Sequence, residues 1–296
     1  MKQSELILNP DGSIYHLGLH PEDIASKVIL VGDQDRVDQI GTHFDEIDQL
    51  HQKREFRSLT GWYQKQRITV LSTGIGADNV DIVWHELDAL VNLDLNTGTP
   101  LPNPTALKAL RLGTCGGLQA RLSPGSLVFS RYSVGADGLM HYYQQPSFRG
   151  KMARFARQLT QFQNSAKLSL PLYPAKSDDE LTELLARNFP QISQGITFTA
   201  SGFYGPQGRS LGRLPITYEN LPHQMSLFRL PEESLEVLNM EMESSAVLGL
   251  GTALGHRTGT ICTVLANRVK GTFAEHPKAE VETLIQTGLE VLLAWE

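Results

Sequence analysis

Short runs of apolar and β-branched residues recur along the chain, and several of them end in segments rich in glycine. Such runs are typical of buried strands, because a strand covered on both faces needs no polar alternation. The pattern predicts strands over residues 27–31, 67–71, 109–112, 126–129, 195–199, 235–239 and 258–265. The glycines after the first three runs, at 32, at 74–76 and at 113–117, predict turns.

Helical periodicity appears between these runs. Residues 78–91 place apolar side chains at spacings of three and four, which is the pattern of a helix with one buried face. Residues 242–254 and 277–295 show similar patterns, and the last begins at Pro277, a residue favoured in the first turn of a helix. Strand, turn and helix therefore alternate, which predicts an α/β fold around a central and mostly covered sheet.

Two segments interrupt this alternation. Residues 92–104 are rich in proline, glycine and asparagine, and the pattern breaks again around 212–231. Neither segment resembles a linker, and the sequence contains no internal repeat or low-complexity tract. We therefore expect residues 1–296 to form a single domain.

Composition narrows the class of protein. Lysine and arginine number 26 against 32 aspartate and glutamate residues, and the net charge of −6 argues against a general nucleic-acid binder. The first twenty residues lack the long apolar stretch of a secretion signal, and no run is long enough to span a membrane. Cys115 and Cys262 are too few for a disulfide framework and are interpreted as core residues. A cytoplasmic enzyme is the expectation.

Three arginines are interpreted as lying at junctions of strands and loops, two of them close to glycines. Arg36 follows Gly32 in the first turn of a predicted helix, and Arg111 precedes Gly113 and Thr114. The third, Arg54, lies in KREF (53–56). Glycine lets an anion approach backbone N–H groups, and guanidinium groups match phosphate oxygens. Taken alone, each arginine is more often a surface ion-pair residue, and the occurrence of three at such junctions weakens that alternative without excluding it.

None of the glycine-rich segments is a Walker motif or a G-x-G-x-x-G fingerprint in the required context, so neither a nucleoside triphosphate nor a dinucleotide cofactor is supported.

Two acids flank a methionine in the segment NMEMESS (239–245), which joins a predicted strand to a predicted helix. A carboxylate there, such as that of Glu243, can accept hydrogen bonds from both hydroxyl groups of a sugar diol. Met242 offers an adaptable apolar surface against the sugar ring. The alternative is structural, because acids are favoured near the N-terminus of any helix.

The segment FYGPQGR (203–209) combines a ring, an amide and a guanidinium. Phe203 can stack on a flat heterocycle, while Gln207 and Arg209 can bond to two carbonyl oxygens of a pyrimidine. An ordinary turn of this composition is the alternative. Elsewhere no Cys/His cluster has the spacing of metal ligands, and a lone histidine such as His16 more often has a structural role.

Eight segments, taken in order, resemble the nucleoside phosphorylase family, and in particular its members that cleave uridine. They are YHLGL (15–19), GDQDRV (32–37), KREF (53–56), STGIG (72–76), RLGTCGG (111–117), FYGPQGR (203–209), NMEMESS (239–245) and TVLANR (263–268). The resemblance covers nearly the whole chain. It implies a single α/β domain around a mixed, partly barrel-like sheet flanked by helices.

The resemblance also assigns the candidate residues to three groups. Those implied for phosphate are Gly32, Arg36, Arg111 and Thr114, with Arg54 from a neighbouring subunit. Those implied for ribose are Met242 and Glu243, with His16 from across the interface. Those implied for the base are Phe203, Gln207 and Arg209, with Arg268 on a loop that closes nearby. The groups expected to act in catalysis are Arg209, Gln207, Glu243 and Arg111.

The activity implied is reversible phosphorolysis of uridine to uracil and ribose 1-phosphate, a reaction of pyrimidine salvage. Inorganic phosphate is the co-substrate, no organic cofactor or metal is expected, and the protein is expected to be at least a dimer with shared sites. Purine relatives carry an acid after the strand at 258–265, whereas residues 265–268 here read Leu-Ala-Asn-Arg. The alternatives are a purine or other nucleoside phosphorylase or hydrolase, and a nucleoside-binding module without activity.

Overall fold

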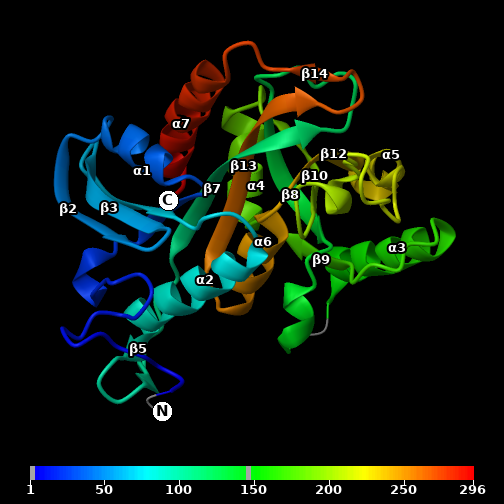
Figure 1. Cartoon of the computed structure of the whole chain (residues 1–296). Coiled ribbons are helices and arrows are strands. Elements are labelled where there is room, and N and C mark those ends of the chain that lie inside the picture. Colours follow the sequence, from blue (N-terminus) through cyan, green and yellow to red (C-terminus); the bar gives the residue numbers. More distant parts are fainter. Residues whose placement is uncertain (1–3, 145–147) are drawn as a thin grey trace.

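A twelve-stranded mixed sheet runs through the computed structural model, which describes residues 4–144 and 148–296 (Figure 1). Its order is β11-β12-β10-β8-β13-β7-β1-β4-β3-β2, with β9 beside β8 and β14 beside β13. The strands are β1 (Lys27–Val31), β2 (Glu46–Lys53), β3 (Phe56–Tyr63), β4 (Gln66–Ser72), β7 (Lys108–Gly117), β8 (Leu127–Gly135), β9 (Tyr173–Lys176), β10 (Ser193–Thr199), β11 (Arg229–Leu230), β12 (Leu235–Glu241), β13 (Arg257–Asn267) and β14 (Thr272–Phe273).

Part of this sheet closes into a ring. Strand β12 pairs with β10 on one side and with β7 on the other, so β7, β13, β8, β10 and β12 form a closed set of five. A small buried cluster drawn mainly from these strands includes Cys115, Val128, Leu238 and Cys262, and it fills the ring. Both cysteines are unpaired and buried, as expected for core residues. The prediction of a mixed, partly barrel-like sheet is confirmed.

Seven α-helices are found in the part of the chain that the structure describes. They are α1 (Gln34–Gly41), α2 (Ala77–Asn92), α3 (Gly150–Ser165), α4 (Asp179–Asn188), α5 (Leu221–Ser226), α6 (Ser244–Ala253) and α7 (Pro277–Ala294). Short 3₁₀ turns occur at η1 (Pro21–Asp23), η2 (Leu139–Tyr142), η3 (Gly205–Gln207) and η4 (Pro231–Glu233). Figure 1 shows α2 and α6 side by side below the sheet, with α1 and α7 beyond its other face.

The position of strand β1 between two layers of helices explains why its sequence lacks polar alternation. Val28 and Leu30 belong to the apolar cluster under α2 and α6. Ile29 and Val31 belong to the cluster on the opposite face, which contains side chains of α1, α4 and α7. Successive side chains of a strand point to opposite faces, so a strand covered by helices on both sides is apolar throughout.

The predicted strands and helices correspond to β1, β4, β7, β8, β10, β12, β13, α2, α6 and α7. Several strands are longer than predicted, and α6 begins at Ser244 rather than at Met242. The break at 92–104 contains a small hairpin of β5 (Leu93–Asp94) and β6 (Thr99–Pro100). The break around 212–231 contains the short helix α5.

One prediction about the backbone is wrong. Residues 113–117 do not form a turn but continue β7, which pairs with β13 as far as Gly117. A Cβ atom on Gly113 would lie 2.1 Å from Nη1 of Arg111, so the glycine makes room for that side chain. Glycine inside a strand often marks such a close approach, and here it was mistaken for a turn signal.

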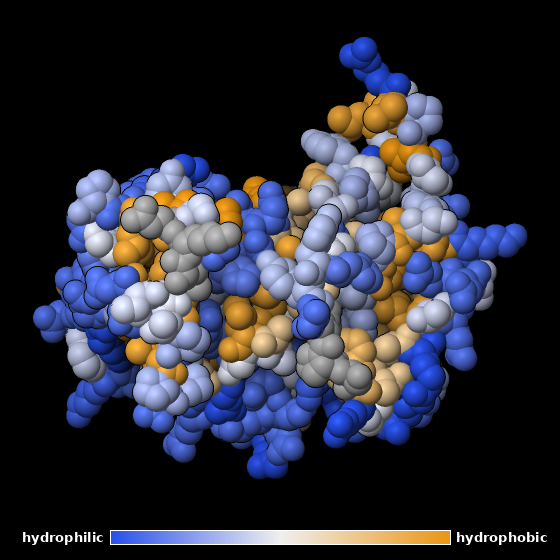
Figure 2. All heavy atoms as spheres, turned by 90° about the horizontal axis from the view of Figure 1, so that it is seen from below, coloured by the Kyte–Doolittle hydropathy of each residue, from blue (hydrophilic) through white to orange (hydrophobic). Residues whose placement is uncertain are grey.

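Among the described residues no helix is long and apolar enough to cross a membrane. On the face drawn in Figure 2, hydrophobic side chains are interspersed with polar ones.

Candidate active site

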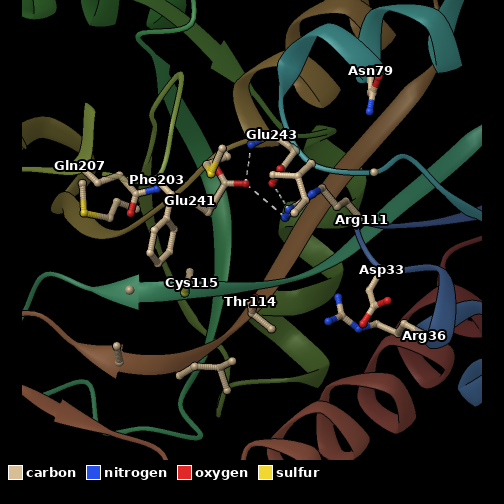
Figure 3. A pocket seen from close by; sticks show the side chains of 18 of the residues that line it. Asp33, Arg36, Asn79, Arg111, Thr114, Cys115, Phe203, Gln207, Glu241 and Glu243 are labelled. Atoms are coloured by element: carbon tan, nitrogen blue, oxygen red, sulfur yellow. Dashed lines mark hydrogen bonds and ion pairs between the residues drawn. The ribbon is translucent and has the colours of Figure 1, made fainter. Parts of the chain in front are cut away.

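A cavity of about 900 Å³ opens where several parallel strands end (Figure 3). Gly32 follows β1, Gly74 follows β4, and the last residues of β7 and β13 contribute Thr114 and Ala266. Ligands in α/β proteins bind outside the carboxyl ends of such strands. Nine of the candidate residues line this cavity: Gly32, Arg36, Arg111, Thr114, Phe203, Gln207, Arg209, Met242 and Glu243.

One end of the cavity carries two buried guanidinium groups. Arg36, in the first turn of α1, is 9% exposed, and its Nη1 donates to the carbonyl oxygen of Leu112 at 3.2 Å. Nε of Arg36 and Nε of Arg111 are buried without a hydrogen-bond partner among the described residues. Burial and the charge of Arg111 lower the pKa of Arg36. An anion between the two groups would supply hydrogen bonds and relieve their repulsion.

Arg111 also contacts two carboxylates at the centre of the cavity. Its Nη2 donates to Oε2 of Glu243, and its Nη1 lies 3.2 Å from Oε2 of Glu241. Burial alone would lower the pKa of Arg111, but the charges of Glu243 and Glu241 outweigh this effect and raise the pKa, so this buried group keeps its charge. Burial raises the pKa of Glu243, an effect that Arg111 opposes. The contact with Arg111 thus favours the charged form of Glu243 against the effect of burial.

Glu243 lies where three segments of the chain meet. It immediately precedes α6, and its Oε1 accepts a hydrogen bond of 2.8 Å from the backbone N–H of Gly76. Figure 3 shows Glu243 and Arg111 between Phe203 and Gln207 on one side and Arg36 on the other. A carboxylate in this position can bind hydroxyl groups of a ligand that extends between the two ends.

The other end of the cavity, the planar end, is formed by the flat side-chain groups of Phe203, Gln207 and Arg209, and Arg209 gives it positive charge. The guanidinium of Arg209 lies 3.9 Å from the ring centroid of Phe203, and it donates to Oε1 of Gln207 and to the carbonyl oxygen of Phe203 at 2.8 Å. Burial and the neighbouring Arg268 lower the pKa of Arg209 to about 10, so it is charged at neutral pH. The group can donate hydrogen bonds to electron-rich oxygens of a flat ligand.

Three candidate residues do not line the cavity. Arg268 contacts the planar end without lining the cavity: its Nη2 donates to the carbonyl oxygen of Gln207 at 3.2 Å. His16 and Arg54 lie together around Tyr15, whose ring centroid is 4.8 Å from that of His16 and 5.7 Å from the guanidinium carbon of Arg54. Nδ1 of His16 lies 2.6 Å from Oε1 of Glu86.

The sequence analysis did not single out Glu241, which organises the centre of the cavity. Its Oε2 accepts hydrogen bonds from the backbone N–H groups of Glu243 at 3.0 Å and of Ser244 at 2.9 Å. The side chain therefore caps α6 as well as pairing with Arg111. The available signal was an acid three residues before the first residue of α6, but the sequence predicted that this helix begins at Met242.

The described residues contain no group of three His, Cys, Asp or Glu side chains that could hold a metal ion.

Residues 26–294 match the family model described as the phosphorylase superfamily. The chain is 28% identical over 292 residues to a uridine phosphorylase of Thermococcus kodakarensis, covering 97% of this chain and 89% of that protein. A guanosine phosphorylase of Halorubrum lacusprofundi is 26% identical, with 94% of this chain and 98% of that protein covered. A solved Trypanosoma brucei nucleoside phosphorylase, described as showing uridine phosphorylase activity, superposes with a TM-score of 0.84 at 29% identity, over 98% of this chain and 99% of that one.

Proposed function

Because the chain belongs to the phosphorylase superfamily, we propose that it catalyses the reversible phosphorolysis of uridine to uracil and ribose 1-phosphate. The observation that carries this proposal is the order of groups in one cavity: paired guanidinium groups at one end, a carboxylate in the middle, and Phe203, Gln207 and Arg209 at the other end. Phosphate, ribose and uracil present complementary chemistry in the same order.

The phosphate end would supply the nucleophile. Cleavage of a glycosidic bond passes through a state with positive charge on the sugar and negative charge on the departing base. A phosphate dianion held by Arg36, Arg111, Thr114 and the backbone at Gly32 would face the cationic sugar and attack its C1′ atom. Glu243 and Met242 would hold the ribose in the orientation that this attack needs. Neither an organic cofactor nor a covalent enzyme intermediate is required.

The planar end would stabilise the leaving group. As the bond to C1′ breaks, charge accumulates on the uracil oxygens, and Arg209 and Gln207 can donate hydrogen bonds to them. Phe203 would stack on the ring, and Arg268 would hold the loop through Gln207. These donors are already fixed by contacts within the protein, which reduces the reorganisation needed in the transition state.

A purine substrate is the second candidate, since a relative is a guanosine phosphorylase. The end of β13 argues against it. Asn267, 1% exposed, donates to the carbonyl oxygens of Gln119 and Leu122 and accepts from the backbone N–H groups of Val269 and Lys270. Its side chain is fully used in holding the turn, and the neighbours that line the cavity, Leu265 and Ala266, cannot protonate a purine ring.

The substrate assignment predicts a specific outcome in a nucleoside panel. Release of uracil from uridine should depend on phosphate and should far exceed base release from inosine, guanosine and adenosine, because the planar end offers donors for two carbonyl oxygens and no acid. The measurement is product formation by chromatography with and without phosphate. Faster turnover of a purine nucleoside would make the assignment wrong, and base release without phosphate would indicate a hydrolase.

The same proposal includes an assembly with shared sites. Arg54 and His16, for which the family resemblance implies roles in phosphate and ribose binding, lie around Tyr15 and outside the lining of this chain's own cavity. A second copy that places this cluster against the cavity would complete the site. We therefore propose a homo-oligomer, at least a dimer, in which each site uses Arg54 and His16 of the neighbouring subunit.

Complementation tests the shared sites. Arg36→Ala and Arg54→Ala chains should each be weakly active alone, whereas their co-expression should form mixed dimers in which one site contains neither change. At equal expression about a quarter of wild-type activity is expected, since half of the dimers are mixed and each has one intact site. The check is activity per mole after co-purification with two different tags. A mixture no more active than its separate components would contradict shared sites.

A further inference from the structure

A chain of buried hydrogen bonds reaches Glu241 from outside the cavity lining. Oγ1 of Thr199, at the end of β10, donates to Oε1 of Glu241 at 2.7 Å. The same Oγ1 accepts the backbone N–H of Ser245, in the first turn of α6, at 2.9 Å. Thr199 and Ser245 are both fully buried. The two bonds tie the end of β10 and the start of α6 to the carboxylate that pairs with Arg111.

The outer end of this chain is a carboxylate that holds two hydroxyl groups. Oγ of Ser245 donates to Oδ2 of Asp137 at 2.8 Å, and the hydroxyl of Tyr173 donates to Oδ1 of Asp137 at 2.7 Å. The two hydroxyl oxygens are 2.9 Å apart. The backbone N–H of Leu139 donates to Oδ1 of Asp137 at 2.9 Å and fixes the carboxylate in place. Burial and the charge of Asp137 raise the pKa of Tyr173, so the hydroxyl stays a donor.

The backbone leaves room for this arrangement at one glycine. Gly135 ends β8, two residues before Asp137, and a Cβ atom there would lie 2.3 Å from Cζ of Tyr173 and 2.7 Å from Oγ of Ser245. Any other residue at this position would push the two hydroxyl groups apart. The end of β8 therefore allows Asp137, which follows this strand, to meet Tyr173 of β9 and Ser245 of α6.

We propose that Asp137 and Tyr173 are positioning residues for the ribose subsite. They hold Ser245, and with it the first turn of α6, in the place from which Glu243 faces the sugar. Neither residue lines the cavity, so they act through Ser245 and Thr199 rather than by touching the substrate. The inference rests on the nucleoside-cleaving function proposed above. Such positioning can affect the rate strongly, because a displacement of about 1 Å in a group that holds the substrate can lower the rate roughly 100-fold.

Tyr173→Phe removes one hydroxyl from this network and keeps the ring. Its matched control is Tyr132→Phe, which removes the hydroxyl of a tyrosine in β8 that is similarly buried as a residue and lies outside the network and the lining of this cavity. The substrate is the ribonucleoside that the wild-type enzyme cleaves fastest, compared with its 2′-deoxy counterpart. A failure of the uridine assignment is therefore seen separately, before the variants are compared. The readouts are kcat and KM for each nucleoside, KM for phosphate, and Tm.

Tyr173→Phe should lower kcat/KM for the ribonucleoside by about tenfold and for the 2′-deoxynucleoside by much less, because a displaced Glu243 loses most with the substrate that offers both hydroxyl groups. KM for phosphate should stay within about twofold of wild type, and Tyr132→Phe should leave the ratio of the two nucleosides unchanged.

Ser245→Ala, which cuts the network at α6, should reproduce the change in that ratio and keeps the test decisive if Tyr173→Phe folds poorly. The proposal is wrong if Ser245→Ala or a folded Tyr173→Phe variant lowers Tm while both nucleosides lose activity equally. A wild-type protein that cleaved no nucleoside would overturn this inference and the proposed function together.

Discussion

Replacing Arg111 with leucine is expected to lower kcat/KM for phosphate by about 10³-fold or more and to destabilise the protein at the same time. Arg111 is 3% exposed as a residue, and its guanidinium faces the anion end of the cavity and pairs with Glu241 and Glu243. Leucine removes a charged donor from the transition state, an effect of about 10²–10³ alone, and leaves two buried carboxylates without a partner. Removing one partner of a buried ion pair typically costs about 3–5 kcal/mol of unfolding free energy. Steady-state kinetics and urea unfolding measure the two effects.

Arg36→Leu is the matched control, because Arg36 belongs to the same end of the cavity but pairs with no carboxylate among the described residues. It should raise the phosphate requirement with a much smaller loss of unfolding free energy. Arg111→Leu protein with wild-type stability and a wild-type phosphate requirement would show that Arg111 neither binds phosphate nor holds the two glutamates.

Replacing Arg209 with leucine is expected to lower kcat/KM for uridine by about 10²–10³-fold while the KM for phosphate changes little. The guanidinium stacks on Phe203 and contacts Gln207 at the end of the cavity opposite Arg36. Leucine keeps part of the apolar contact but cannot stabilise charge that develops on the uracil oxygens. Initial rates over a grid of uridine and phosphate concentrations separate the two substrates, and circular dichroism checks that the variant is folded.

Arg213→Leu provides a control for charge alone, since Arg213 lies four residues further along the same loop, is exposed and does not line the cavity. It should behave like wild type. The division of the site would be wrong if Arg209→Leu weakened phosphate use as much as Arg111→Leu does, or left uridine turnover intact.

The sequence predicted the strands that read as uninterrupted apolar runs and missed those that do not. Strand β1 and its parallel neighbours read as uninterrupted apolar runs because helices cover both sides of them. Strand β2 lies at the edge of the sheet, and most of its side chains are exposed, so its sequence EIDQLHQK carries no such signal. Helix α3 buries Phe155 and Leu159 and packs Met152 and Phe162 against the same cluster, so its apolar residues have helical spacing and the prediction left this signal unused.

In the candidate site, too, residues within local motifs could be predicted, whereas contacts between distant residues could not. Nine of the residues drawn from separate motifs line one cavity, which the ordered motifs allowed the sequence to predict. The pairing of Arg111 with Glu243 joins positions 132 residues apart, and no local pattern contains it. The second ion pair of Arg111, with Glu241, was missed for the same reason.

The guanidinium of Arg111 lies between the anion end and Glu243, so binding of one ligand is expected to change the affinity for the other. It joins the carboxylate in the middle of the cavity to the anion end, so an arriving dianion competes with Glu243 for the same positive charge. Glu243 then becomes a freer acceptor for the sugar hydroxyls. Thermodynamic linkage makes this effect reciprocal: the factor by which one ligand changes the affinity for the second equals the factor by which the second changes the affinity for the first. If phosphate and nucleoside bind as proposed, the two substrates are coupled through this single side chain.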